Sequence, residues 1–360
     1  MRDLAILADD LTGALDAAAA FARPGEPVAV GWDALAGPGI AIDSETRNAP
    51  RDVARAKVAS LLPVLGGARI AFKKVDSLLR GNSFTEIAVC CASGAFDAVI
   101  VAPAFPDQGR TTAGGRLVGR DFATRSPSIC EGLRAEGLAT AQVSGTDAPP
   151  DSGVSICDAS TNDDLRRIVR SAAAWGGRVL WCGSAGLAYA LTDGRATVPS
   201  VSSSLAIIGS RHPLSRDDAV RLRASPGPCY VELNDPSRAE EAADAVAALM
   251  RQGLRAALAF GLPELSPRQA KACYRRAFAR LASTAPRPDG VIVVGGDTLF
   301  WLAEAVSAAA LDVWGDRSPG VPKSVIRGGV WHGVGVISKS GAFDGGGLLA
   351  DFGREELERG

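Results

Sequence analysis

Short apolar segments that suit β-strands alternate with alanine- and arginine-rich segments that suit helices along most of this chain. In the first half, the predicted strands are residues 4–8, 28–32, 39–43, 69–73, 98–102 and 179–182. The predicted helices between them include residues 51–62, 163–174 and 185–191. Strands that are apolar on both faces and separated by helices are typical of a mainly parallel sheet with right-handed crossovers. This alternation therefore predicts an α/β fold.

The composition changes at residues 192–204, TDGRATVPSVSSS, to a Ser-, Thr-, Gly- and Pro-rich stretch that is typical of a linker. A second alternating set follows, with predicted strands at 205–208, 229–233, 256–260 and 290–294 and predicted helices at 215–224, 237–251, 266–282 and 298–309. A chain of 360 residues also exceeds what one hydrophobic core usually serves. We therefore expect two domains, 1–200 and 205–360, each a mainly parallel sheet flanked by helices, with an active-site cleft between them.

The charge balance excludes several classes of partner. The chain carries 39 Lys and Arg against 40 Asp and Glu, a net charge of −1, with basic residues spread along it. This argues against a nucleic-acid-binding face and against binding to an anionic membrane. Seven cysteines without a CxxC pair, and an N-terminus unlike a signal peptide, predict a cytoplasmic protein. Two histidines are too few for a histidine-rich metal site.

The segment at residues 4–22 begins with an apolar run that ends in two adjacent carboxylates, Asp9 and Asp10. A Thr-Gly turn and a helix of small residues follow. Ligands of α/β sheets bind beyond the carboxyl ends of the strands, so this pattern delivers polar groups to a binding site. Two carboxylates there indicate proton abstraction, hydroxyl binding or metal coordination. The alternative is structural, because Asp10 or Thr12 would also serve as the N-cap of the helix.

Cations follow the next strand ends. Arg47 comes after strand 39–43, and its planar guanidinium suits a carboxylate or phosphate, although a surface arginine is the alternative. KKVDSLLRGN gathers charged and polar groups after strand 69–73: Lys73, Lys74, Asp76, Ser77, Arg80 and Asn82. These groups would hold a polyhydroxylated acid, with the cations on its carboxylate and Asp76 and Ser77 on its hydroxyls. The alternative is a solvated charged loop.

The loop APAFPDQGRTTAGG brings Arg110 and two threonine hydroxyls beyond another strand, although a structural turn explains its prolines equally well. In the second half, the strand of GVIVVGGDTLFWLAEAV leads through Gly295 and Gly296 to a helix that begins near Asp297 and Thr298. Paired glycines let the backbone approach a bulky ligand, and a helix N-terminus favours phosphate. Similar small-residue or cationic loops follow other strands, at Ser210 and at Lys339 to Gly341.

Together these loops would cradle a nucleotide without a standard phosphate loop, since the chain contains no GxxxxGK[ST] motif. The near match to a dinucleotide fingerprint, GGGLLA at residues 345–350, lacks the preceding strand and the later acidic partner.

Taken in order, these motifs resemble those of the four-carbon acid sugar kinase family. The similar segments are ADDLTGALD, Thr46-Arg47, KKVDSLLRGN, APAFPDQGRTT, GSAGLA, GGDT, PGVP and SKSGAF. The resemblance implies an N-terminal domain that binds a sugar acid such as threonate, erythronate or a 3-oxo-tetronate. It also implies a C-terminal domain that binds ATP, with the phosphate transferred to the terminal hydroxyl of the acid.

The resemblance also implies roles for individual residues. Carried over by motif, Asp9 or Asp10, Arg47, and Lys74, Val75, Asp76 and Ser77 would hold the sugar acid, while Ser210, Gly295, Gly296, Asp297, Thr298 and Gly341 would hold ATP. Leu78 replaces the threonine usual in the family motif, and Asp297 stands where many members carry glutamate.

Phosphoryl transfer needs positive charge and a group that orients or deprotonates the attacking hydroxyl. The candidate cations are Lys74, Arg47, Arg80 and Lys339, and the candidate bases are Asp76, Asp10 and Asp9. Mg²⁺ would accompany ATP. Two other functions stay open: a sugar-acid and nucleotide sensor that has lost transfer, and a nicotinamide-dependent sugar-acid dehydrogenase. The expected partner is a small sugar acid, and a homodimer is compatible with the sequence.

Overall fold

The computed structural model describes residues 2–119, 128–138, 140–143, 153–174, 176–192, 202–262 and 265–354. It divides into two compact units, Met1–Ala196 and Thr197–Gly360. Most of the predicted linker, residues 193–201, lies outside the described residues. None of the described helices is long and apolar enough to cross a membrane.

Among its described residues, the first unit contains a parallel sheet of eight strands in the order β2-β3-β1-β4-β10-β5-β9-β8. The strands are β1 (Arg2–Ala8), β2 (Val28–Gly31), β3 (Gly39–Asp43), β4 (Ala68–Lys74), β5 (Ala98–Ala102), β8 (Thr140–Val143), β9 (Gly153–Cys157) and β10 (Val179–Gly183). A separate hairpin consists of β6 (Thr111–Ala113) and β7 (Arg116–Val118). The α/β class with a parallel sheet is therefore confirmed for this unit.

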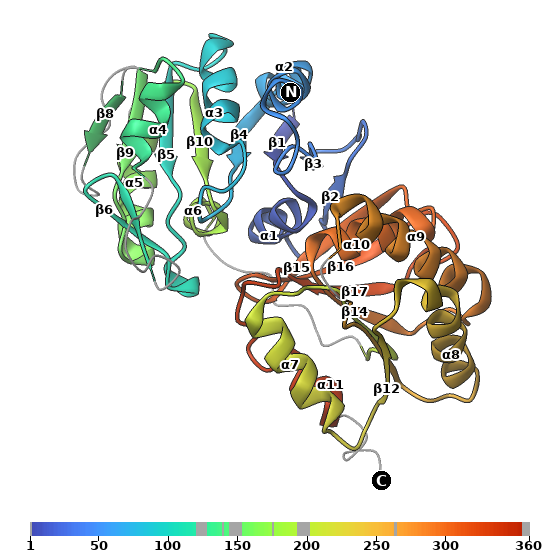
Figure 1. The fold of residues 1–360 in the computed structure, drawn as a ribbon. Coiled ribbons are helices and arrows are strands. Elements are labelled where there is room, and N and C mark those ends of the chain that lie inside the picture. The colour runs from blue at the N-terminus through green and yellow to red at the C-terminus, as the bar shows by residue number, and fades with distance from the viewer. Residues whose placement is uncertain are drawn as a thin grey trace. The chain divides into compact units, whose positions relative to one another are not determined.

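Helices cover both faces of this sheet. They are α1 (Leu11–Phe21), α2 (Arg51–Gly66), α3 (Ser83–Ala92), α4 (Ile129–Ala135), α5 (Asn162–Ala173) and α6 (Ala185–Ala190), with a 3₁₀ turn η1 (Pro106–Gln108). Figure 1 shows α2, α3 and α4 side by side on one face and α1, α6 and α5 on the other. Because α1 is built almost entirely of small buried residues, it packs close against β1, β2 and β3.

The second unit contains strands in the order β12-β13-β11-β14-β17-β16-β15. These are β11 (Leu205–Ile208), β12 (Cys229–Leu233), β13 (Ala256–Phe260), β14 (Gly290–Val294), β15 (Ala310–Ser318), β16 (Val321–Arg327) and β17 (Gly335–Lys339). Its helices are α7 (Pro213–Arg223), α8 (Ala239–Arg251), α9 (Pro267–Thr284), α10 (Gly296–Ala305) and α11 (Leu348–Arg354), with a 3₁₀ turn η2 (Pro236–Arg238). In Figure 1, α8, α9 and α10 cover one face of the sheet, while α7 and α11 lie together on the other.

Five neighbouring strands of this order, β12, β13, β11, β14 and β17, are parallel to one another. The next strand, β16, runs antiparallel to both β17 and β15. The sequence patterns did not predict β15, β16 or β17. In β15 and β16, charged residues interrupt the apolar alternation. Asp312 and Arg327, for example, form an ion pair across the two strands. The sheet of this unit is thus mainly parallel, as expected, with an antiparallel hairpin added at one edge.

Candidate functional site

The carboxyl end of β1 presents Asp9 and Asp10, as the first motif predicted. Asp10 is the N-cap of α1, and its Oδ1 accepts a hydrogen bond from the Gly13 amide at 2.8 Å. Its Oδ2 accepts a bond from the Thr12 hydroxyl at 2.9 Å. The structural interpretation of Asp10 as a helix cap is therefore confirmed, although the same carboxylate also contacts a cation.

That cation is Arg47, which gathers the carboxylates of the site. Its Nε and Nη2 donate to the two oxygens of Asp9 at 2.8 and 2.9 Å, and its Nη1 donates to Asp10. Nη2 also lies 3.6 Å from Asp76 Oδ1. Burial alone would raise the pKa of Asp9, but the charge and hydrogen bonds of Arg47 outweigh burial and lower the pKa. The planar fork expected to receive a ligand is thus engaged by aspartates of the protein itself.

The turn that carries Arg47 is fixed by hydrogen bonds to neighbouring strand ends. The amides of Thr46 and Arg47 both donate to the Asp9 carbonyl at 3.1 Å. From the loop after β4, Asn82 Nδ2 donates to the carbonyls of Thr46 and Ala49 at 2.8 and 2.9 Å. Asn82, which the sequence placed among the ligand-binding groups, therefore ties the two loops together.

Lys74, the last residue of β4, extends toward the first turn of α1. Its ammonium donates to the Val75 carbonyl at 2.8 Å. A Cβ added to Gly13 would lie 2.9 Å from Lys74 Nζ and 2.6 Å from Asp10 Oδ1. Gly13 thus makes room for the ammonium beside the capping carboxylate, and an ammonium so placed can bind an anionic or hydroxylated ligand.

Asp76 is held by Arg80 four residues later. Arg80 Nε and Nη2 donate to its carboxylate at 2.6 and 2.8 Å, and the Arg80 amide adds a bond of 3.1 Å. Burial would raise the pKa of Asp76, but the hydrogen bonds from Arg80 and the charges of Arg47 and Arg80 lower it well below its usual range. Asp76 is therefore ionised at neutral pH and accepts hydrogen bonds.

Arg110 reaches the same loop from the segment after β5. Its Nη1 donates to the Ser77 hydroxyl at 2.7 Å, and both side chains are buried. The backbones of Phe105 and Arg110 exchange hydrogen bonds of 2.7 and 3.1 Å, which closes the loop that delivers Arg110. The loop after β5 thus contacts KKVDSLLRGN through Arg110, and a structural turn accompanies it.

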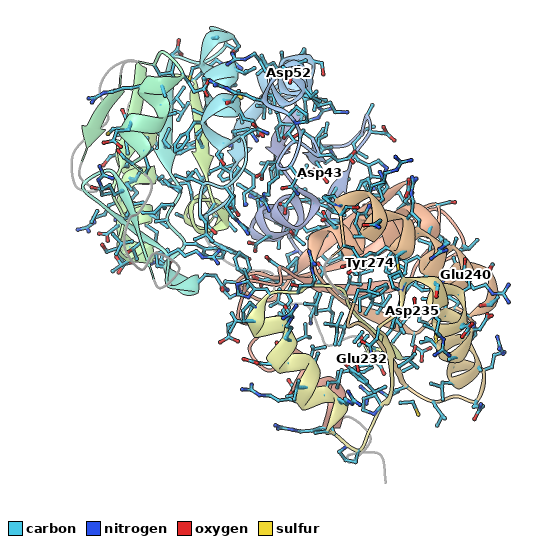
Figure 2. The ribbon with its side chains drawn as sticks, viewed as in Figure 1. Asp43, Asp52, Glu232, Asp235, Glu240 and Tyr274 are labelled. Carbon is cyan, nitrogen blue, oxygen red and sulfur yellow. The ribbon has the colours of Figure 1, made fainter. Side chains whose placement is uncertain are left out.

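One buried carboxyl of this region was not among the predicted site residues. Asp43 ends β3, opposite Ala8 of β1, and is 3% exposed (Figure 2). Its Oδ1 accepts the Glu45 amide at 2.7 Å. Burial raises the pKa of Asp43 well above its ordinary value, and the charges of Asp10, Glu45 and Asp9 add to the rise. The sequence signal that could have identified Asp43 is its place at the end of a predicted strand, where it lies opposite the residue that precedes Asp9.

In the second unit, glycines at neighbouring strand ends let the loops that follow these strands pack closely together. Gly209 and Ser210 both donate their amides to the Val294 carbonyl, at 3.1 and 3.2 Å. A Cβ on Gly341 would overlap Ser210 Oγ, so these two loops touch through a residue that lacks a side chain. Gly295 has φ +117°, a conformation that favours glycine, directly before α10. We refer to residues 209–210, 295–298 and 340–341 as the glycine cradle.

An aromatic cluster supports the glycine cradle from α9. The Tyr274 hydroxyl donates to the Gly209 carbonyl at 2.7 Å. The ring of Tyr274, labelled in Figure 2, stacks on Phe260 with centroids 4.1 Å apart, and the centroid of the Trp301 ring of α10 lies 4.8 Å from that of Tyr274. A Cβ on Gly209 would overlap the hydroxyl of Thr298, which is itself buried. The backbone of the cradle is therefore held in place by side chains beneath it.

Lys339 ends β17 next to the cradle, but its side chain is fully buried. Its ammonium lies 3.3 Å from Asp218 of α7 and donates to the Phe343 carbonyl at 3.1 Å. These contacts join α7 to the loop that follows β17. Within the described parts of the chain, no group of three or more His, Cys, Asp or Glu is arranged to hold a metal ion.

Comparisons with known proteins agree with this arrangement. The fold and the polar strand ends define an α/β protein with a candidate ligand site at the carboxyl ends of its strands. Residues 4–129 and 131–191 match the family model described as a sugar-binding N-terminal domain. The chain belongs to the four-carbon acid sugar kinase family, and the resemblance inferred from its motifs is confirmed.

Two curated relatives carry the name D-threonate kinase. The protein from Cupriavidus necator is 28% identical over 376 residues, 89% of each chain. The protein from Bordetella bronchiseptica is 28% identical over 386 residues, 94% of each chain. A solved structure described as the putative tRNA synthase from Salmonella typhimurium LT2 has a TM-score of 0.77 over 99% of this chain and 100% of its own, at 19% identity. This likeness supports the fold.

Proposed function

We propose that this protein is an ATP-dependent kinase that phosphorylates the terminal hydroxyl of a four-carbon sugar acid of the threonate type. Its family and the names of its relatives support a sugar-acid kinase. The observation that carries the proposal is the cluster at the carboxyl ends of β1, β3 and β4. There, three carboxylates (Asp9, Asp10 and Asp76) meet three cations (Arg47, Lys74 and Arg80).

We assign sugar-acid binding to the first unit. Such a substrate has one carboxylate and several hydroxyls, so its site needs fixed cations and hydrogen-bond acceptors together. Arg47 is engaged by Asp9 and Asp10, and Arg80 by Asp76. We assign the substrate carboxylate to Lys74, whose ammonium donates to the Val75 carbonyl, and to Arg80, which is half-exposed. Asp76 accepts hydrogen bonds from the hydroxyls, with Ser77 and Val75 beside it and Arg110 anchoring Ser77.

We assign Asp76 the role of orienting the attacking hydroxyl. Its lowered pKa makes it a weak base, which suits a reaction whose transition state needs alignment and charge more than early deprotonation. Asp10 is the second candidate. Both carboxylates already accept three hydrogen bonds, Asp76 from Arg80 and Asp10 from Gly13, Thr12 and Arg47, but Asp10 is also the N-cap that begins α1. Lys74, at the N-terminus of α1, supplies positive charge close to the reacting groups.

We assign ATP binding to the glycine cradle of the second unit. Gly209, Gly295 and Gly341 let the loops of the cradle pack closely against Ser210 and Thr298 at the N-terminus of α10, and a helix N-terminus favours phosphate. Ser210, Gly296 and Thr298 complete this cradle, and Lys339 fixes the loop behind it. Mg²⁺ bound to nucleotides keeps several waters and needs one or two carboxylates, and Asp297 in the first turn of α10 is the one we assign. The ion would neutralise charge on the phosphates.

A direct assay tests this function. The protein is incubated with MgATP and each tetronic acid stereoisomer, and ADP release and product mass are measured. We expect one acid to gain a single phosphate at its terminal hydroxyl. Asp76→Asn should lose turnover while ATP still binds, and Asp52→Asn, on the exposed start of α2, is the matched control. Binding of a tetronic acid without any product would favour the sensor, and reduction of NAD would favour the dehydrogenase.

A further inference from the structure

Directly behind the sugar-acid site lies a second charged pair that the proposed chemistry does not use. Lys73 of β4 and Glu86 of α3 are both 0% exposed, and Lys73 Nζ lies 2.6 Å from Glu86 Oε2. Among the described residues, Glu86 Oε1 has no hydrogen-bond partner. Burying such a pair costs several kcal/mol per ion, and well-packed apolar side chains are often as stable or more so. Stability alone therefore gives no reason for this pair.

The remaining contacts of Lys73 reach two strand ends. Its ammonium donates to the Leu7 carbonyl of β1 at 3.2 Å and to the Lys74 carbonyl at the end of β4 at 3.0 Å. Leu7 lies two residues before Asp9, and Lys74 lies two residues before Asp76. One ammonium therefore bridges the backbones of the two strands whose next residues are the site carboxylates.

The ammonium also remains charged in this buried place. Burial alone would lower the pKa of Lys73, but the charges of Glu86 and Asp9 outweigh it and raise the pKa. The alternation of strand side chains explains why the adjacent lysines differ: Lys73 points to Glu86 of α3, and Lys74 points to Gly13 of α1.

We propose that Lys73, held by Glu86, is a positioning residue that fixes the spacing of the β1 and β4 ends and thereby aligns Asp9 with Asp76. Its effect on catalysis rests on the kinase function proposed above, whereas its effect on the two strand ends does not. Substrate is not expected to touch it, because the ammonium is closed off from solvent.

Three variants separate positioning from stability. Lys73→Met/Glu86→Leu removes both charges and keeps the volume, so it should fold. Glu86→Gln leaves Lys73 in place, as an ammonium or as a neutral amine. Either form retains enough N–H groups to donate to the carbonyls of Leu7 and Lys74. Leu65→Ala removes a fully buried side chain at the end of α2 and serves as the control for destabilisation alone. Lys73→Gln/Glu86→Gln repeats the first test with polar side chains if the apolar pair does not fold.

Two readouts are taken on each full-length variant. The first is amide hydrogen exchange in peptides covering residues 4–12 and 70–80. We expect exchange at least tenfold faster in both peptides for the double variant, with Glu86→Gln close to the parent. The second is steady-state kinetics with D-threonate and MgATP. We expect kcat/KM for the acid to fall at least tenfold while KM for ATP changes less than twofold.

The outcomes separate the two proposals. Exchange in the double variant no faster than in Leu65→Ala overturns the positioning role, whatever the activity. Faster exchange with parental kcat/KM also overturns it, since the spacing would then not matter to the reaction. If the parent protein phosphorylates no tetronic acid, the proposed function fails, and hydrogen exchange still decides whether Lys73 orders the strand ends.

Discussion

Gly81 offers a sharp test of how the first unit is assembled. It has φ +70°, and a Cβ there would overlap the Arg47 carbonyl oxygen and lie 3.0 Å from the carbonyl carbon. The substitution Gly81→Ala therefore carries two penalties: a left-handed backbone conformation and a clash with a backbone group that cannot rotate away. Gly94, just after α3, has φ +63° and nothing within 4 Å of its added Cβ, so Gly94→Ala carries the first penalty alone.

The two variants should differ by the clash. The left-handed conformation costs a side chain roughly 1–2 kcal/mol, and overpacking adds about 1–3 kcal/mol. We expect Gly81→Ala to lower the free energy of unfolding of this unit by about 2–5 kcal/mol, and Gly94→Ala by about 1–2 kcal/mol. Because the Arg47 turn must shift, Gly81→Ala should also lower kcat/KM for the sugar acid, and Gly94→Ala should not.

Urea unfolding followed by circular dichroism, with kinetics on the same preparations, measures both effects. Limited proteolysis at the transition identifies which unit has unfolded. If the two variants are equally stable and equally active, the contact between residue 81 and the Arg47 turn does not order the site, and the argument built on that contact is wrong.

Three other predictions follow from single positions. Gly341→Ala should raise KM for ATP at least fivefold and leave KM for the acid unchanged in steady-state assays, since its methyl group would displace Ser210 Oγ within the glycine cradle. Asp43→Asn should raise Tm at pH 7.5 but not at pH 3.5. The folded pKa of Asp43 is raised, so the parent loses stability as pH rises from the unfolded pKa of about 3.9 through the folded value, whereas Asn does not ionise; equal Tm shifts at both pH values would contradict this. Cys90, whose pKa burial raises to about 12, and the fully buried Cys182 should resist iodoacetamide at pH 7.5 until urea unfolds the protein, as read by peptide mass spectrometry.

The sequence predicted the strands that are continuously apolar, because burial on both faces leaves a plain pattern in the residues. It therefore located the polar strand ends as well, and with them Asp9, Lys74 and Asp76. It did not predict β8, β9 and β17, and it missed β15 and β16, where charged residues pair across strands, as Asp312 does with Arg327. A charged pair of this kind can be recognised only when the register of the two strands is known, and the register is a property of the folded sheet.

Side-chain partners were harder to predict than positions. Arg47 was expected to face a ligand, yet three aspartates from two other strand ends surround it. Lys339 was expected at the nucleotide, yet its ammonium is buried against Asp218 of α7. In both cases the neighbouring residues indicate that a charge lies near the end of a strand. The partner of that charge lies in a distant segment of the chain, and no pattern in the neighbouring residues predicts which one.

The double lysine at the end of β4 combines both lessons. As letters, Lys73 and Lys74 are equivalent, and both were candidates for binding an acid. Strand geometry sends them to opposite faces, one toward the buried Glu86 and the other toward Gly13 in the first turn of α1. The two positions should therefore respond differently to the same change. Lys74→Met removes a charge from the site and should lower kcat/KM for the acid. Lys73→Met leaves Glu86 buried without its partner and should first lower the free energy of unfolding.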